Sequence, residues 1–444
     1  MSGIAGIARP GQSEKVRSML EAMSHRGQNI RILETGVATL GGVWSEDQAA
    51  NLDKLTQSHI ALDGTGDGHF ALAEGDRLLL KRDPVGVAPL YYGWTGEGAL
   101  CFASEVKGLM TITRNVFELP PGSGFDGNRF ETYFQLVKQD PVEDDPVNIA
   151  RELRRRLETV IKIAAESGNV GSWLSGGLDS SVLAAIAHTY LGPLHTFTAG
   201  FAGSTDVVHA QIVAEAIRSV HHVRLVKLED LVKALPDVIY HLESFDAWLV
   251  RSSIMNYLVA ELAADYVPAV FSGEGGDELF AGYTYLKKLD PVRLPDELID
   301  ITSRLHNTAL QRVDRCASAF STTAHVSFLE PEVFDYALRI PLRYKLDHGV
   351  EKWILRQAVV DILPAAIVNR PKAKFWQGSG VEEILAQYTE EKITDGDFAR
   401  ERSLSNGWIL NSNEELLYYR IFRQYFGKIE DLRWMGRSKG SPVQ

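Results

Sequence analysis

Cysteine is scarce in this chain of 444 residues, which contains only Cys101 and Cys316. Two thiols provide neither a disulfide framework nor a zinc cluster, and such scarcity is typical of a reducing cytoplasm. The sequence also lacks an apolar run long enough to cross a membrane, and no basic segment followed by an apolar core opens the chain. We therefore expect a cytoplasmic protein without a signal peptide and without a membrane partner.

Positive charge is in short supply as well. Lysine and arginine together number 46 against 58 acidic residues, so the formal net charge is -12. This balance argues against a nucleic acid as the main partner, because nucleic-acid-binding surfaces are basic. With 45% hydrophobic and 23% charged residues the composition is that of a globular protein, and the length predicts two domains.

Residues 1–118 carry short apolar runs separated by glycine-rich turns, such as GVATLGGVW and GALCFAS. This pattern predicts a small β-rich domain with one helix near Glu14–Ser24. The next stretch begins with LPPG, which interrupts any regular element, and ends in an acidic segment that contains proline. We expect residues 119–145 to link two domains.

From residue 146 onward, helix-like and strand-like segments alternate. Such alternation predicts βαβ units and a parallel sheet covered by helices, so residues 146–444 should form an α/β domain. The expected strands are Val170–Leu174, Leu194–Ala199, Val223–Val226 and Ala269–Phe271. The expected helices are Ser181–Tyr190, Val207–Ser219, Leu231–His241 and, in a helix-rich C-terminal third, Lys352–Asp361 and Glu414–Phe426.

The strongest chemical signal is the segment SGGLDSS, between an apolar strand and an apolar helix. It consists of Ser175, Gly176, Gly177, Leu178, Asp179, Ser180 and Ser181. The glycines and the helix N-terminus offer backbone N–H groups to an anion, the serines add neutral donors, and Asp179 can hold a divalent cation. The segment lacks the lysine of GxxxxGK[ST], so transfer of a γ-phosphoryl group is not expected. The alternative is a glycine turn with a serine cap.

A second glycine-rich loop, SGEGGDE at 272–278, follows the expected strand Ala269–Phe271. The carboxyl ends of parallel strands lie at one edge of a sheet, so both loops should open into the same crevice. Asp277 is a candidate second magnesium ligand, and Glu274 is a candidate general base for an attacking amine. The alternative is a solvated acidic turn.

Further motifs accompany these two loops, namely HRG at 25–27, DPVGVAPLYY at 83–92, FASEVK at 102–107 and LPPG at 119–122. The set extends over nearly the whole chain and resembles the glutamine-dependent asparagine synthetases and their relatives, the β-lactam and carbapenam synthetases. The resemblance implies an α/β fold with a shortened β-sandwich of the N-terminal-nucleophile (Ntn) type. It also implies that the second domain is an ATP-pyrophosphatase, a doubly wound parallel sheet of the adenine nucleotide α-hydrolase-like type with a helical C-terminal part.

The resemblance assigns roles to the site residues. Those around ATP and its pyrophosphate would be Leu174, Ser175, Gly176, Gly177, Leu178, Asp179, Ser180, Ser181, Ser272 and Gly273. Asp179 and Asp277 would bind Mg²⁺. Lys372 would stabilise the charge that develops at the pentavalent phosphorus, with its neighbour Lys374 ranked second. Arg251 matches a family arginine at the substrate and pyrophosphate end.

The first domain departs from the family pattern where glutamine chemistry would occur. The family nucleophile is a cysteine, and this chain has Ser2 at that position. A terminal serine can still act as a nucleophile with its own α-amine as base. However, the Asn-Gly-Glu-type segment and the later aspartate that clamp glutamine have no counterpart, since too few residues separate Leu40 from Phe70. We expect a catalytically silent domain and a nitrogen donor other than glutamine.

The expected substrate pocket also differs from the family. Trp248 and Leu249 replace two adjacent threonines of bacterial asparagine synthetases, and TAHVSF at 323–328 replaces Glu-Ala-Arg-Val-Pro-Phe. Losing hydroxyls and an arginine changes which carboxylate fits. The substrate-binding candidates are Trp248, Leu249, Arg251 and His325, with packing as the alternative for His325. Glu274 instead favours an asparagine synthetase, because asparagine synthetases carry glutamate at this position and lactam synthetases carry tyrosine.

Three hypotheses follow. The first is an ATP-dependent amide synthetase that acts within one small amino-acid substrate and closes a β-lactam in natural-product biosynthesis. The second is an ammonia-dependent enzyme similar to asparagine synthetase. The third is a non-catalytic nucleotide-binding relative, which the intact SGGLDSS loop, Asp277 and Lys372 disfavour. None of these hypotheses involves a nucleic acid, and the sequence is compatible with a homodimer.

Overall fold

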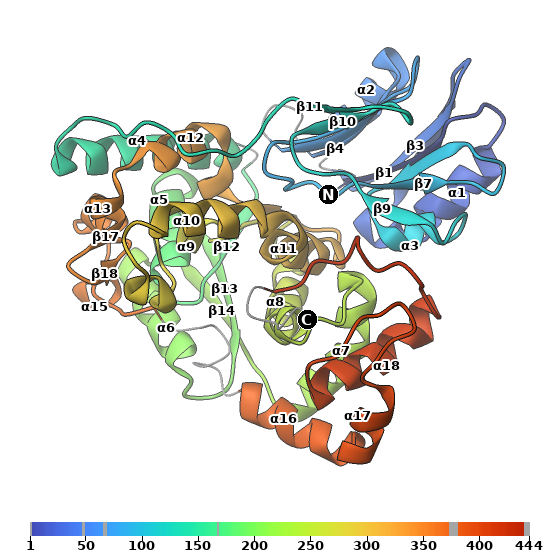
Figure 1. Ribbon diagram of the computed structural model, residues 1–444. Helices are drawn as coiled ribbons and strands as arrows, with labels where there is room; N and C mark the ends of the chain where they lie inside the picture. The colour runs from blue at the N-terminus through green and yellow to red at the C-terminus, as the bar shows by residue number, and fades with distance from the viewer. Residues whose placement is uncertain (1, 47–48, 65–68, 167, 373–380, 439–444) are drawn as a thin grey trace.

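The structure is a computed structural model that describes residues 2–46, 49–64, 69–166, 168–372 and 381–438. Two antiparallel sheets form the N-terminal part, and a five-stranded parallel sheet with covering helices forms the rest (Figure 1). The expected α/β fold is confirmed.

The first antiparallel sheet has six strands in the order β2-β3-β1-β8-β7-β9. Their bounds are Asn29–Glu34, Thr39–Trp44, Ser2–Ile7, Leu100–Ala103, Tyr91–Trp94 and Val116–Glu118. Helix α1 (Ser13–Glu21), which corresponds to the predicted helix near Glu14–Ser24, packs on this sheet. The short helix α3 (Val106–Leu109), which was not predicted, follows β8. A glycine in β3 permits the close packing, because a Cβ on Gly41 would come within 2.7 Å of Leu20 Cδ1.

The second antiparallel sheet has five strands in the order β11-β10-β6-β5-β4. Their bounds are Phe130–Thr132, Ser123–Phe125, Leu79–Arg82, Phe70–Glu74 and Ile60–Gly64, and helix α2 (Ala49–Ser58) packs next to β4. The two sheets share one apolar core, to which the first contributes Ile4 and Phe102 and the second contributes Ala71 and Leu80. The expected β-sandwich is therefore present.

Strands β10 and β11 fall inside the range 119–145. They pair with each other, and β10 also pairs with β6. Phe125 and Phe130 stack with their ring centroids 4.3 Å apart, which stabilises this hairpin. This part of the predicted linker thus belongs to the second sheet, and the irregular connection to α4 (Pro146–Ala165) is residues 133–145. A Pro-Gly turn ends an element locally but does not show whether the next strand returns to the same sheet.

The parallel sheet has the order β14-β13-β12-β15-β16. Its strands are Val220–Leu225, His195–Gly200, Val170–Trp173, Ala269–Phe271 and Thr323–His325. The order reverses beside β12, since β13 and β14 lie on one side of it and β15 and β16 on the other. Loops that leave the two strands at such a reversal diverge and leave a crevice between them. Here they are the two glycine-rich loops. Strand β16 was not expected, because its three residues form no apolar run.

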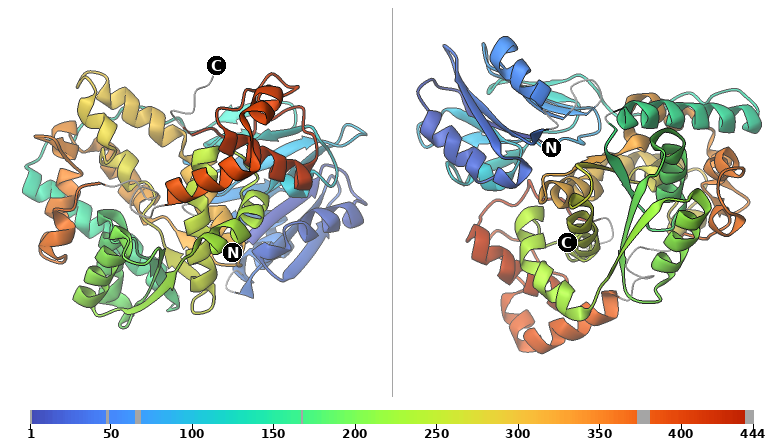
Figure 2. Two further views of the ribbon diagram at one scale, coloured as in Figure 1. Left: turned by 90° about the horizontal axis from the view of Figure 1, so that it is seen from below. Right: turned by 180° about the vertical axis from the view of Figure 1, so that it is seen from behind.

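Helices cover both faces of this sheet (Figure 2), which confirms the doubly wound arrangement. Helices α5 (Leu178–Leu191) and α6 (Thr205–Ile217) lie on one face, with α4 behind α5. Helix α8 (Ala247–Ala264) lies on the other, with α7 (Leu228–Leu242) and α11 (Ala309–Ser318) packed against it. Helix α8 was not predicted, because a helix surrounded by other elements is apolar on most of its circumference and shows no amphipathic period.

The C-terminal third is helical, as predicted. Helices α12 (Pro331–Arg339) and α14 (Trp353–Val359) pack on α4, and α18 (Asn413–Phe426) packs on α7 and α8. The remaining elements are α9 (Gly276–Leu279), α10 (Leu294–Ser303), α13 (Leu342–Lys345), β17 (Leu346–Asp347), β18 (Val350–Glu351), α15 (Ala365–Val368), α16 (Val381–Lys392) and α17 (Asp395–Glu401). Within the described ranges, none of the helices has both the length and the apolar character that crossing a bilayer requires.

A buried cluster of charges joins the β-sandwich to the parallel-sheet domain. Arg26 donates through Nε to Glu105 Oε1 at 2.6 Å and is ion-paired with Asp314 of α11. The Nη1 atom of Arg315 lies 3.2 Å from Glu105 Oε1, and its Nη2 atom lies 3.1 Å from Glu243 Oε2. Glu243 also accepts hydrogen bonds from two N–H groups at the start of α3. Opposite charges are thus matched across the boundary, which fixes how the two parts dock.

Replacing Arg315 with methionine should leave Glu105 and Glu243 buried with one partner fewer. We expect the free energy of unfolding to fall by about 3–5 kcal/mol, since a buried charge that loses its partner keeps its desolvation cost. The control is Arg433→Met, because Arg433 forms an ion pair with Asp431 at the surface and its side chain is 76% exposed. Its loss should cost less than about 1 kcal/mol. Urea unfolding measures both variants, and equal losses would contradict the role of the cluster.

Candidate functional site

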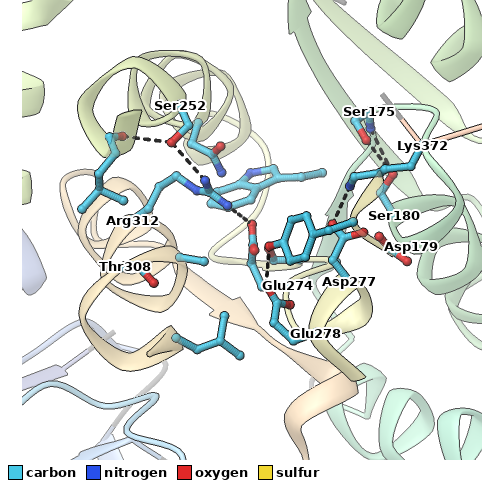
Figure 3. A pocket seen from close by; sticks show the side chains of 18 of the residues that line it. Ser175, Asp179, Ser180, Ser252, Glu274, Asp277, Glu278, Thr308, Arg312 and Lys372 are labelled. Atoms are coloured by element: carbon cyan, nitrogen blue, oxygen red, sulfur yellow. Dashed lines mark hydrogen bonds and ion pairs between the residues drawn. The ribbon is translucent and has the colours of Figure 1, made fainter. Parts of the chain in front are cut away.

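A cavity of about 570 Å³ lies at the carboxyl edge of the parallel sheet, between the loops that follow β12 and β15 (Figure 3). Residues of α8 and α11 form its far wall. The predicted site residues that line it are Leu174, Ser175, Asp179, Ser180, Trp248, Leu249, Ser272, Gly273, Glu274, Asp277 and Lys372. The structure thus brings both glycine-rich loops, Lys372 and two of the predicted substrate-binding residues into one site.

The first loop presents the N-terminus of α5 to the cavity. Gly176 has a φ of 68°, and a Cβ there would come within 2.4 Å of the backbone nitrogen of Ala210, so glycine is required. The Ser175 N–H donates to the Ser180 hydroxyl at 3.2 Å, which holds the turn in place. Behind it, the first turn of α5 contains Leu178 and Ser181 and is preceded by Gly177. A preformed turn at a helix N-terminus suits an anionic ligand.

The second loop, residues 272–278, lies directly against the first. A Cβ on Gly273 would come within 3.0 Å of the Ser180 nitrogen, so a larger residue would push the loops apart. The Ser272 N–H donates to the carbonyl of His325 in β16 at 2.9 Å, which fixes the start of this loop. The crevice expected from parallel-sheet geometry is therefore present, and both loops border it.

Two aspartates and two lysines form a charge cluster where the loops meet. Lys352 Nζ is paired with Asp179 and lies 2.6 Å from Asp277 Oδ1, while Lys372 Nζ donates to Asp277 Oδ2 at 2.5 Å. Burial raises the pKa of Asp179, and the nearby Lys352 only partly offsets this. For Asp277, the two ammonium groups outweigh burial and hold the pKa well below its ordinary value. The cluster therefore places ammonium groups beside carboxylates, as recognition of a metal-bound polyphosphate requires.

Asp179 has spare capacity for a metal ion. Its Oδ1 atom is buried and has no hydrogen-bond partner among the described residues, whereas Oδ2 is paired with Lys352. A buried acceptor without a partner is costly, and Mg²⁺ prefers carboxylate oxygens as ligands. Asp179 and Asp277 thus fit the magnesium site that the sequence predicts.

Lys352 is a member of this cluster that sequence reasoning misses. It immediately precedes α14, with a φ of 54° and a buried side chain. Its side chain passes so close to Gly282 that a Cβ there would come within 2.2 Å of Lys352 Cε. The sequence places Lys352 at the start of a predicted helix, and nothing in the helical pattern indicates that its ammonium group reaches Asp179.

The opposite end of the cavity is formed by α8 and α11. Trp248, Leu249 and Ser252 line it from α8. Arg312 of α11 points across this end, donating through Nη1 to Ser252 Oγ at 3.0 Å and pairing through Nη2 with Glu274 (Figure 3). The candidate general base is thus held by an arginine to which the sequence motifs do not point.

Two substrate-binding candidates, Arg251 and His325, do not line the cavity, and for His325 the structure shows the packing alternative. Position 251 lies on another face of α8, where the guanidinium donates through Nε to Glu414 of α18 at 3.2 Å. His325 lies in β16, and its ring packs against Phe271 with the ring centroids 5.8 Å apart. The structure therefore does not bring either residue to the substrate end of the site. Lys374 lies outside the described residues.

Comparison with known proteins agrees with this geometry. The sequence model of asparagine synthase matches residues 152–299 and 293–439, which together exceed half of the chain. The chain belongs to the asparagine synthase family. The resemblance predicted from the motifs is confirmed, and a model of a glutamine amidotransferase domain also matches residues 53–111 of the β-sandwich.

Relatives within the asparagine synthase family show the extent of the similarity. The glutamine-hydrolysing asparagine synthetase B of Escherichia coli is 34% identical over 388 residues, covering 81% of this chain and 70% of the relative. The glutamine-hydrolysing asparagine synthetase of Zea mays is 33% identical over 394 residues, covering 81% of this chain and 66% of the relative. This family member is therefore an ATP-dependent ligase that forms carbon–nitrogen bonds.

In the β-sandwich of this asparagine synthase family member, the Ser2 hydroxyl takes part in a buried hydrogen-bond network. Ser2 is buried, and its Oγ donates to Asp63 Oδ1 at 2.9 Å. The same oxygen accepts from the Gly64 N–H at 3.2 Å and from Asn51 Nδ2 at 3.4 Å. A hydroxyl has one proton to donate and two lone pairs, so these contacts use its full hydrogen-bonding capacity. Asp63 in turn accepts from Ser104 Oγ at 2.8 Å.

Replacing Lys352 with methionine should weaken ATP binding about 10- to 100-fold, because a hydrogen-bonded charge is lost beside two carboxylates that repel phosphate. Calorimetric titration with ATP and Mg²⁺ measures the change, and circular dichroism checks that the variant is folded. The matched control is Lys287→Met, since Lys287 pairs with Glu351, whereas Lys352 pairs with Asp179 and Asp277. Unchanged affinity in Lys352→Met would contradict a role for this lysine at the phosphates.

Proposed function

We propose that this ligase adenylates a substrate carboxylate and then joins the acyl group to an amine of the same molecule, which closes a lactam ring. The convergence of both glycine-rich loops with the aspartate–lysine cluster in one cavity carries the proposal. An anion site without a P-loop lysine favours displacement at the α-phosphorus over transfer of the γ-phosphoryl group.

In the activation step, the substrate carboxylate attacks the α-phosphorus of ATP, and pyrophosphate leaves toward the SGGLDSS loop at the start of α5. Lys352 and Lys372 stabilise the negative charge that develops on the phosphorus oxygens and on the leaving group. Asp179 and Asp277 would hold Mg²⁺, which would supply further charge neutralisation. The product is an acyl adenylate with its acyl group directed toward α8 and α11.

In the transfer step, the substrate amine attacks the acyl carbon, Glu274 takes up the amine proton, and AMP leaves. Trp248 and Leu249 line this end with apolar groups, and such a wall limits access of water to the reactive acyl adenylate. The substrate is a small amino acid, because the cavity of about 570 Å³ must also hold ATP.

The proposed amine is internal to the substrate because the glutamine pathway is poorly supported. The position of the family's nucleophilic cysteine holds Ser2, whose hydroxyl is buried and fully hydrogen-bonded. A substrate that carries its own amine needs no glutaminase domain. It also needs a different pocket, and Trp248 and Leu249 replace the two threonines of the bacterial asparagine synthetases. A β-lactam formed in natural-product biosynthesis is the product we propose.

The second candidate function is an ammonia-dependent synthesis like that of asparagine synthetase. Two observations favour it. Asparagine synthetases carry glutamate at the position of Glu274, and the relatives from Escherichia coli and Zea mays are asparagine synthetases. The two functions share the activation step and differ only in the origin of the amine.

Exchange of labelled pyrophosphate into ATP tests the activation step, since reversible adenylation incorporates label only when a suitable carboxylate is present. We expect exchange with a diamino dicarboxylic acid and a cyclised product that has lost one water. Exchange with L-aspartate accompanied by ammonia-dependent formation of asparagine would contradict lactam closure and support the second candidate. Absence of exchange with every acid would favour a non-catalytic nucleotide-binding relative.

Glutamine hydrolysis tests the first domain separately. We expect no glutamate release above that of a blank, because the Ser2 hydroxyl is buried and hydrogen-bonded. Amide formation should be the same in the Ser2→Ala variant as in the unchanged protein. Glutamate release that disappears in Ser2→Ala would show that the serine is a nucleophile. It would contradict the prediction that the first domain has no glutaminase activity.

A further inference from the structure

The C-terminal segment from Trp434 to Ser438 connects the β-sandwich with the cavity. At its start, the buried Trp434 ring lies edge-on against Tyr91 of β7, with the ring centroids 6.3 Å apart. At its end, Ser438 lines the cavity, and among the described residues it is the one lining residue beyond Lys372. In Figure 1 this segment is the dark red coil that leads toward α8.

One buried carboxylate fixes the end of this segment to α8. Asp246 is buried and caps α8, since its Oδ1 accepts the Leu249 N–H at 2.9 Å. The same carboxylate accepts the Ser438 N–H through Oδ2 at 3.1 Å and the Ser438 hydroxyl through Oδ1 at 2.8 Å. Beside it, Arg437 Nη2 lies 2.8 Å from Glu415 Oε1 of α18. Hydrogen bonds to an ionised group are the strong ones, so the segment is held where α8 begins to line the cavity.

The middle of the segment packs directly on the wall of the cavity. A Cβ on Gly436 would come within 2.0 Å of the backbone oxygen of Asn307. Asn307 ends the short helical turn Leu305–Asn307, and Leu305 lines the cavity. The segment therefore contacts the wall at this turn and is hydrogen-bonded to it at the start of α8.

These contacts place the segment at the end of the cavity where the proposed transfer step occurs. Ser438 lines this end together with Trp248, Leu249 and Leu305. An acyl adenylate reacts with water as well as with an amine, and an enclosed site prevents the loss because it excludes water. A segment that completes the wall at this end thus influences which of the two acceptors reaches the acyl group.

We propose that residues 434–438 determine the acceptor, by closing this end of the cavity so that an amine and not water attacks the acyl adenylate. Without this closure, the oxygen of a water molecule bonds to the acyl carbon and the bond from that carbon to the AMP oxygen breaks. The free acid, AMP and a proton are then released, and no amide forms. Asp246 is a positioning residue, because it acts through Ser438 and the start of α8. The inference rests on the proposed function and concerns its transfer step.

The experiment measures AMP and amide in the same reaction with ATP, Mg²⁺ and an acid. The acids are a diamino dicarboxylic acid and, with ammonium chloride, L-aspartate. The unchanged protein should form AMP and amide in equal amounts. Gly436→Ala should raise the ratio of AMP to amide about 10-fold, because the added methyl group displaces the segment from Asn307 and admits water. Pyrophosphate exchange should not change, since the phosphate end is not altered.

A second variant and a matched control accompany Gly436→Ala. Ser438→Pro lacks both hydrogen-bond donors to Asp246 and leaves the cap of α8 in place, so it should raise the same ratio. Gly396→Ala is the same substitution in α17, where the nearest atom would lie 3.7 Å from the added Cβ. The ratio should therefore not change in this control. Circular dichroism checks that each variant is folded.

Three outcomes would contradict parts of this scheme. An unchanged ratio of AMP to amide in the folded variants would overturn the inference. A fall in pyrophosphate exchange that matches the fall in amide would overturn it as well, because the segment would then only support the fold. Absence of exchange with every acid in the unchanged protein would instead overturn the proposed function itself.

Discussion

The pairing of two aspartates with two lysines at the meeting point of the glycine-rich loops is the constraint on which the synthetase site depends. Charges can be buried together only when each has an opposite partner, because an unpaired buried charge is too costly. Asp179 and Asp277 come from the loops after β12 and β15, and Lys352 and Lys372 come from the C-terminal helical part. The same ion pairs that tie these segments together supply the groups to which the proposed function assigns the binding of ATP.

Helix α11 connects this site to the first domain. Arg312 points from the helix into the cavity, while Asp314 and Arg315 belong to the buried charge cluster that includes Arg26 and Glu105. The β-sandwich thus packs directly against a helix that lines the acceptor end of the cavity. The first domain can therefore contribute to the site by supporting the position of α11.

The two ends of the cavity differ in how completely their charged side chains are paired. At the phosphate end, Lys352 is paired with both aspartates, and each partner comes from a different segment. At the acceptor end, Arg312 leaves its Nε unsatisfied while it pairs with Glu274. In the proposed function, the fully paired cluster would bind ATP and the other end would bind the amino-acid substrate.

The sequence by itself determined what depends on local order along the chain. Alternating apolar segments predicted the four strands β12 to β15 and the helices α5, α6 and α7. The segments SGGLDSS and SGEGGDE predicted an anion site at one edge of a parallel sheet. Helix α8 was missed because a helix packed on several sides shows no amphipathic period. Strand β16 was missed because its residues, Thr-Ala-His, form no apolar run. Strands β10 and β11 were likewise hidden in an apparent linker.

Only the tertiary structure decided which side chains meet. Lys352 reaches Asp179 and Asp277, and Arg312 reaches Glu274, across distances in sequence that no motif spans. Arg251 and His325 match or replace family residues at the substrate end, yet the face of α8 and the packing of β16 direct them away from the cavity. The identity of a residue determines the chemistry of its side chain, whereas tertiary packing determines which other side chains it contacts. The end of the cavity formed by α8 and α11 depends on tertiary packing.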